Sequence, residues 1–121
     1  MELYNMTEAE MRFADLIWEN EPIGSGRLVK LCDERFGWKK STTYTFLKKL
    51  CDQEVFRNED AVVTSVLDKA AYNQKRGEKF LEDTYDGSLP KLIAAFMNKK
   101  KLCRRQVEEI EKMIEEYKED I

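Results

Sequence analysis

Apolar residues recur at helical spacing along most of this chain, and the pattern divides it into successive amphipathic helices. A first apolar stripe predicts a helix over about residues 7–20, and it consists of Met11, Ala14, Ile17 and Trp18. Thr7 and Glu10 stand in front of this stripe with the spacing of a capping box. The beginning of the first helix is therefore well marked.

The next segment, Glu21-Pro22-Ile23-Gly24, interrupts the helical pattern. Ser25 is placed to cap a second helix, and Gly37 is placed to end it. The core residues expected from this second helix are Leu28, Val29, Leu31, Cys32 and Phe36. We therefore expect a helix over about residues 25–36.

Residues 38–52 predict a third helix with two unlike faces. One face can bury itself, and it carries Thr43, Leu47 and Leu50 with Phe46 at its edge. The other face carries Ser41, Thr45, Lys48 and Lys49. Hydroxyls near the helix start and ammonium groups near its end suit an element that enters a DNA major groove and binds the flanking phosphates. A stripe of Lys and Thr is also typical of an ordinary solvated helix face, so this pattern alone leaves both interpretations open.

The segment 54–66 changes character and predicts a short β-hairpin. Strand-forming valines flank the turn-prone Asn58-Glu59-Asp60. A hairpin that directly follows a helix-turn-helix is a wing. Because Glu59 and Asp60 would be repelled by phosphate, Arg57 is the candidate DNA contact in this wing.

From Leu67 onward the pattern is helical again. A charged helix over about residues 68–86 ends at Gly87, and Ser88 with Pro90 opens the next. That next helix has a strongly apolar face made of Leu89, Leu92, Ile93, Phe96 and Met97. In the last helix the apolar residues step alternately by four and three, the pattern of a packing seam, and they are Cys103, Val107, Ile110, Met113, Ile114, Tyr117 and Ile121.

Three carboxy-terminal helices predict self-association, because one is long and half exposed and the other two have broad apolar faces. The residues expected to pack against a second copy are Leu89, Leu92, Ile93, Phe96, Met97, Val107, Ile110, Ile114 and Tyr117. A monomer whose helical layer folds back on the wing is the alternative. The basic connection at 99–105 is interpreted as a solvated loop and helix start, with a second DNA site as the other interpretation.

The predicted fold is mainly α, with a winged helix-turn-helix of three helices and a short hairpin, followed by a three-helix dimerisation region. The corresponding domains are residues 1–67, which bind DNA, and residues 68–121, which form the dimer. With 121 residues and 42 % hydrophobic composition, the chain can bury one modest core, or two small ones if a partner completes the second.

Charge restricts where DNA can bind. The formal net charge of −3 argues against a protein that coats nucleic acid indiscriminately. Residues 37–57, however, carry five basic residues against two acidic ones. Any DNA binding must therefore be local to this segment.

Several classes of protein are excluded by composition. Three widely separated cysteines on apolar faces indicate small buried thiols, and without His or a Cys-x-x-Cys pair a metal site within one chain is not expected. The chain also has no His base, Gly-rich phosphate loop or convincing carboxylate pair, so we expect neither an enzyme nor a cofactor. It has no apolar run long enough to cross a bilayer, which predicts a cytoplasmic location.

The third helix carries a resemblance to a known family. Its segment 41–50, Ser-Thr-Thr-Tyr-Thr-Phe-Leu-Lys-Lys-Leu, resembles the recognition helix of the penicillinase and methicillin-resistance repressors, the BlaI/MecI/CopY family. The opening residues 6–10 with Ile17-Trp18 resemble that family's first helix. Segment 86–89 with the apolar helix after it resembles the dimerisation region. The similarity runs from about Met6 to Tyr117 and is most specific in the recognition helix.

The resemblance implies a homodimeric winged-helix repressor that occupies a palindromic operator in double-stranded DNA. Two recognition helices would enter successive major grooves about 34–36 Å apart. By position, Ser41, Thr42 and Thr45 match the groove-facing residues of the family, and Lys49 matches its phosphate contact. Lys40 and Lys48 are added from charge alone.

This sequence departs from the family pattern in three places. The family wing usually has a Gly-Arg pair and an aromatic residue, whereas this chain has a shorter wing with Glu59-Asp60-Ala61-Val62. This departure predicts weaker DNA binding or heavier reliance on the recognition helix. In the β-lactam-resistance branch a membrane metalloprotease sensor cuts an Asn-Phe bond, and the matching candidate site here is Ala95-Phe96. Cys103 alone does not replace the paired Cys-x-Cys elements of the copper-responsive branch.

One alternative function from a different class remains open at this stage. A winged-helix module for protein–protein interaction would use the Thr and Lys face together with the acidic wing to bind a protein partner. The dependence of duplex binding on salt separates the two, because only phosphate neutralisation makes affinity fall steeply with salt.

Overall fold

The computed structural model describes residues 4–121. In chain order its elements are α1 (Glu8–Asn20), β1 (Ile23–Gly24), α2 (Ser25–Phe36), α3 (Lys40–Asp52), β2 (Phe56–Glu59), β3 (Val62–Ser65), α4 (Lys69–Tyr85), α5 (Leu89–Asn98) and α6 (Arg104–Lys118). The chain divides into two compact units, and the border between Glu78 and Lys79 falls inside α4. The predicted fold class, a winged helix-turn-helix followed by helices, is confirmed. The domains 1–67 and 68–121 describe a division of function and stay a prediction.

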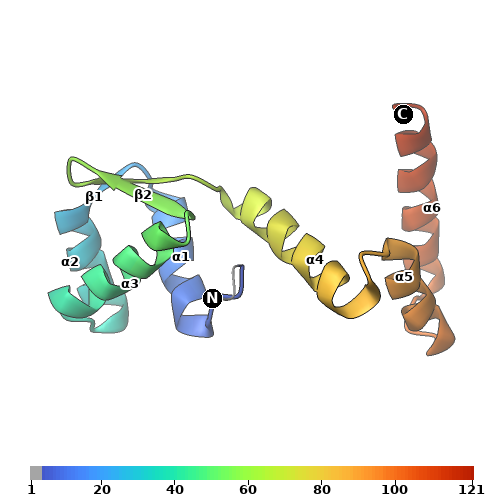
Figure 1. The fold of residues 1–121 in the computed structure, drawn as a ribbon, viewed down its shortest axis with the longest axis horizontal. Coiled ribbons are helices and arrows are strands. Elements are labelled where there is room, and N and C mark those ends of the chain that lie inside the picture. The colour runs from blue at the N-terminus through green and yellow to red at the C-terminus, as the bar shows by residue number, and fades with distance from the viewer. Residues whose placement is uncertain (1–3) are drawn as a thin grey trace. The chain divides into compact units, whose positions relative to one another are not determined.

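In the first unit, α1, α2 and α3 lie together, with the hairpin of β2 and β3 across one end of the three helices (Figure 1). The predicted capping box begins α1: the Thr7 hydroxyl accepts from the Glu10 backbone N–H, and the Glu10 carboxylate accepts from the Thr7 backbone N–H. These bonds satisfy two donors that the helix itself cannot pair. The sequence prediction for this helix is confirmed.

The beginning of α2 differs from the prediction. Ser25 does not cap the helix but is its first residue, after Gly24, and it is buried. Its backbone N–H donates to the Ala61 carbonyl at 2.8 Å, and its hydroxyl accepts from the Tyr44 hydroxyl at 3.2 Å. The wing turn therefore satisfies one of the free N–H groups at the start of α2. At the other end Gly37 adopts a left-handed conformation with φ of 69° and ends α2 as predicted.

The sheet contains one more strand than the hairpin alone. Its order is β1-β3-β2, and both strand pairs are antiparallel. The predicted hairpin is confirmed, with Phe56 opposite Ser65 and Glu59 opposite Val62, although the turn lies at Asp60 and Ala61 rather than at residues 58–60. The segment expected only to break the helix supplies β1, in which Ile23 pairs with Val63. The sheet thus ties the connection before α2 to the wing.

The core of the first unit combines all three helices, the sheet and the start of α4. Its largest fully buried side chains are Phe13, Ile17, Leu28, Leu47, Leu50, Val55, Phe56, Val63 and Tyr72. Tyr72 comes from the first turn of α4, and its hydroxyl accepts from the Met6 backbone N–H at 3.2 Å. The partly buried Trp38 stacks on this core against Phe46, with ring centroids 4.3 Å apart. The orientation of α3 is therefore fixed by packing from several elements.

The second unit contains the end of α4 with α5 and α6. The Ser88 hydroxyl caps α5 as predicted, by accepting from the Lys91 backbone N–H. Neither α5 nor α6, both described in full, contains a buried residue. Among residues 4–121, every helix is too short or too polar to cross a membrane.

The cysteines correct one prediction. All three are free, but only Cys32 is buried, Cys51 is half-buried, and Cys103 is exposed at the residue that precedes α6. The prediction placed all three on buried apolar faces. Cys103 departs from it because it precedes α6, a helix that has no buried residue within this chain.

Candidate nucleic-acid interface

The third helix, α3, presents the two faces that its sequence predicts. Thr43, Leu47 and Leu50 are buried against the core of the first unit. The exposed residues on the outer side are Lys40, Ser41, Thr45, Lys48 and Lys49, and Thr42 is half-buried beside them. Because the buried side is packed from several elements, the outer side is held at a fixed angle and is free to meet a ligand.

The hydroxyls occupy the first half of this surface. The Thr45 hydroxyl donates to the Ser41 carbonyl at 2.9 Å, so its only proton is used within the helix. Its oxygen lone pairs and its methyl group remain exposed. In this arrangement Thr45 can accept from the amino group of adenine or cytosine and can pack on a thymine methyl.

The lysines of α3 are held differently from one another. Lys48 pairs with Asp52 at 3.3 Å, and both side chains are largely exposed. Such surface pairs contribute little and break easily. The Lys40 ammonium lies 6.0 Å from the centre of the Tyr44 ring, which leaves it equally accessible. Both lysines are therefore available to a polyanion.

Lys49 has a stronger partner. Its ammonium lies 2.9 Å from the Glu10 carboxylate, and only 4 % of the Glu10 side chain is exposed. Burial raises the pKa of this carboxyl, but hydrogen bonds from Thr7 and Lys49 outweigh burial and hold the pKa below its ordinary value. Glu10 was predicted as a helix cap, and its link to α3 was not. The two residues are far apart in sequence, so no local pattern relates them.

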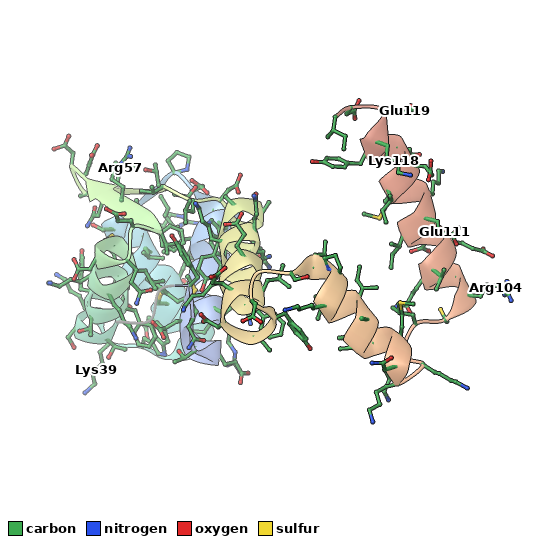
Figure 2. The ribbon with its side chains drawn as sticks, turned by 45° about the vertical axis from the view of Figure 1, so that its right-hand side comes forward. Lys39, Arg57, Arg104, Glu111, Lys118 and Glu119 are labelled. Atoms are coloured by element: carbon green, nitrogen blue, oxygen red, sulfur yellow. The ribbon has the colours of Figure 1, made fainter. Side chains whose placement is uncertain are left out.

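The wing contains one candidate basic contact, Arg57, which lies beside the acidic Glu59. Arg57 on β2 is exposed and lies 3.6 Å from Glu59. Lys39 and Arg57 project from opposite ends of the first unit (Figure 2). Lys39, the residue before α3, was not among the predicted contacts, although its charge next to Lys40 was the available signal. The lysines on and beside α3 thus outnumber the basic residues of the wing.

The predicted dimerisation residues form exposed or half-buried apolar faces in the second unit. Leu89, Phe96, Met97, Val107, Ile114 and Tyr117 are exposed, with 64 % of Tyr117 accessible. Leu92, Ile93 and Ile110 are half-buried. Arg104 and Glu111 project from the same side of α6 and belong to its charged surface (Figure 2). Met113 and Ile121 extend the apolar face and are even more exposed, at 67 % and 81 %.

The candidate proteolytic bond lies inside α5. Ala95 is half-buried and Phe96 is exposed, and both have regular helical backbone. A protease needs an extended substrate, so cutting here requires α5 to open locally.

Comparison with known proteins adds independent information. A family model described as penicillinase repressor matches residues 6–116. The penicillinase repressor of Bacillus licheniformis is 22 % identical over 117 residues, which cover 93 % of this chain and 91 % of that protein. The methicillin resistance regulatory protein MecI of Staphylococcus aureus is 20 % identical over 115 residues, which cover 92 % and 94 % of the two chains.

Proposed function

We propose that this chain, which belongs to the penicillinase repressor family, is a homodimeric repressor of transcription that binds a palindromic operator through α3. Membership of the family supports a DNA-binding repressor of transcription in general. The dimer, the operator symmetry and the contacting residues are the new content of the proposal. The observation that carries it is the exposed hydroxyl and lysine surface of α3 on a rigidly packed helix.

In the proposed complex α3 lies in the major groove. Ser41, Thr42 and Thr45 face base edges from the first half of the helix. Lys40, Lys48 and Lys49 bind phosphates that flank the groove, and Arg57 binds one from the wing. Since Thr and Ser hydroxyls can serve several bases, these residues do not determine one sequence.

A second copy completes the protein in this proposal. The apolar residues of α5 and α6 are accessible in one chain, and burying them against a twin removes this surface from water. A two-fold symmetric dimer then presents two copies of α3, and the half-sites would lie about one helical turn of DNA apart. This symmetry is why the proposed operator is a palindrome.

Salt dependence tests the DNA contacts. For the unmodified chain, we expect the logarithm of duplex affinity to fall steeply with the logarithm of salt concentration. Lys48→Ala should reduce that slope by about two for the dimer, because each lost phosphate contact removes about 0.9. Lys75→Ala, on the exposed surface of α4, is the matched control and should leave the slope unchanged. An unchanged slope in Lys48→Ala would remove this residue from the interface.

The acidic wing tip supports one alternative function. Glu59 and Asp60 are exposed and would be repelled by phosphate, and the chain carries a net charge of −3. A protein-interaction module would bind a protein partner through the Thr and Lys face of α3 together with this acidic wing. In that case the unmodified chain would show no steep salt dependence on any duplex.

Inactivation of the repressor by proteolysis is a separate part of the proposal. The resemblance implies cleavage by a membrane metalloprotease sensor, but this chain has Ala95 where the cleaved bond of the family has Asn. We propose Ala95-Phe96 as the bond to examine. Co-expression with such a sensor, followed by mass spectrometry, gives fragments ending at Ala95 if the route operates and an intact chain if it does not.

A further inference from the structure

The Lys49 ammonium stands between a buried carboxylate and the open surface of α3. On one side it contacts Glu10 at 2.9 Å, while 55 % of the Lys49 side chain remains exposed. Thr45 and Phe46 on α3, together with Thr7 at the start of α1, line a shallow cleft of about 260 Å³ around this pair. The buried carboxylate thus lies directly beneath the surface proposed to meet DNA.

The hydrogen bonds of the pair leave donors unused. One Glu10 oxygen accepts from the Thr7 backbone N–H at 3.0 Å, and the other accepts from Lys49. A lysine ammonium has three N–H donors. The bond to Glu10 uses one, so the same ammonium can bind a phosphate oxygen without leaving Glu10.

Breaking the Lys49–Glu10 ion pair costs more free energy than breaking the Lys48–Asp52 ion pair beside it. If Lys49 moved away, the buried Glu10 carboxylate would keep its hydrogen bond from Thr7 but lose its only ion-pair partner within residues 4–121. Asp52, by contrast, is 62 % exposed, so Lys48 can leave it at little cost. Consecutive lysines on α3 therefore differ in their partners: Lys48 pairs with an exposed carboxylate and Lys49 with a buried one.

We propose that Glu10 is a positioning residue of the DNA interface, which holds the Lys49 ammonium so that it binds an operator phosphate while still paired with the carboxylate. This inference rests on the proposed function. A held ammonium loses little side-chain freedom on binding, whereas a free lysine must be ordered at that moment. Glu10 thus strengthens DNA binding although it carries the same sign of charge as DNA.

The direction in which Glu10→Gln changes duplex affinity distinguishes a positioning role of Glu10 from simple charge repulsion. Glu10→Gln removes a negative charge close to the phosphates, which by itself raises duplex affinity. If Glu10 positions Lys49, affinity falls instead, by about tenfold for the dimer, because each protomer must now order a long side chain. Asp52→Asn is the matched control: it removes the exposed partner of Lys48, and affinity should stay the same or rise. An unchanged or higher affinity in Glu10→Gln overturns the proposal.

A second pair of variants tests the phosphate contact itself. Lys49→Gln alone leaves the buried Glu10 carboxylate with its Thr7 hydrogen bonds but no cation, which would change stability together with DNA binding, so Lys49 is removed in the Glu10→Gln background. The double variant Glu10→Gln/Lys49→Gln should show a salt slope lower by about two for the dimer than Glu10→Gln alone. Equal slopes would mean that Lys49 serves only the fold. Lys49→Arg keeps the charge and the pairing, and should bind within a few-fold of the unmodified chain.

The measurements use a duplex enriched from a random pool by the unmodified chain, with circular dichroism to show that each variant is folded. If the unmodified chain enriches no duplex, the proposed function and this inference both fail. If it binds and Lys48→Ala lowers the salt slope, but the two tests above give the opposite results, only the inference about Glu10 fails.

Discussion

Helices α3 and α6 are both amphipathic and of similar length, yet their apolar faces differ in burial. Helix α3, with 13 residues, buries Thr43, Leu47 and Leu50 within its own unit. Helix α6, with 15 residues, buries none, and Ile114 is 48 % exposed. The first unit thus completes its core within one chain. In the second unit the apolar face of α6 stays accessible to solvent, which is the physical reason for proposing that a second copy of the chain packs against it.

This difference means that the two units should respond differently to dilution. A core closed within one chain has a stability independent of protein concentration. A core closed by a partner gains stability by mass action, so its unfolding midpoint rises with concentration. Substitutions in the two units can therefore be distinguished by repeating one unfolding experiment at several concentrations.

The largest effect is expected inside the first unit. Phe13 is fully buried against Trp38 and Phe46, so Phe13→Ala should reduce the free energy of unfolding by about 3–5 kcal/mol at every protein concentration. Phe96→Ala, in the second unit, should lower the urea midpoint only at concentrations where the chain is paired. Equal behaviour of the two variants would contradict the distinction between the units.

The next effect concerns pairing itself. Ile114→Asp places a charge in the proposed interface and should weaken self-association by at least about 100-fold, as measured by sedimentation equilibrium. Operator affinity should fall with it. Glu116→Gln, on the outer side of α6, is the control and should leave association unchanged. A paired Ile114→Asp variant would show that the apolar seam of α6 is not the interface.

The smallest effect separates two threonines of α3. The Thr43 hydroxyl is buried, and apart from an interaction with the weakly polar Cys32 thiol it has no hydrogen-bond partner within residues 4–121. Thr43→Val keeps the shape and should raise the free energy of unfolding by about 1 kcal/mol while leaving duplex affinity unchanged. Thr45→Val should do the reverse, with no gain in stability and weaker duplex binding. Thermal unfolding and duplex titration of both variants check this contrast.

Local patterns were enough to predict much of the fold. The period of α3 separated Leu47 from Thr45, and the spacing of Thr7 and Glu10 gave the start of α1. The hairpin followed from its valines and turn residues. Each of these features depends on residues that are close in sequence, where propensity and periodicity apply directly.

Features that depend on distant residues were missed. Strand β1 has only two residues and exists because β3, much later in the chain, pairs with it. Ser25, which was expected to be the cap, is the first residue of α2, and its N–H donates to the Ala61 carbonyl of the distant wing turn. Tyr72 was assigned to a partly exposed helix, but the core of the first unit buries it completely. The pairing of Glu10 with Lys49 is of the same kind, since only the packing of α1 against α3 brings them together.

The proposed function is tested most directly by selecting duplexes from a random pool with the full chain. We predict enrichment of an inverted repeat whose half-sites lie about one turn of DNA apart. Such a result requires both units at once, because α3 reads each half-site and pairing of the second unit sets their spacing. Enrichment of a single, unrepeated half-site would contradict the paired arrangement, and enrichment of no sequence would contradict recognition of an operator through α3.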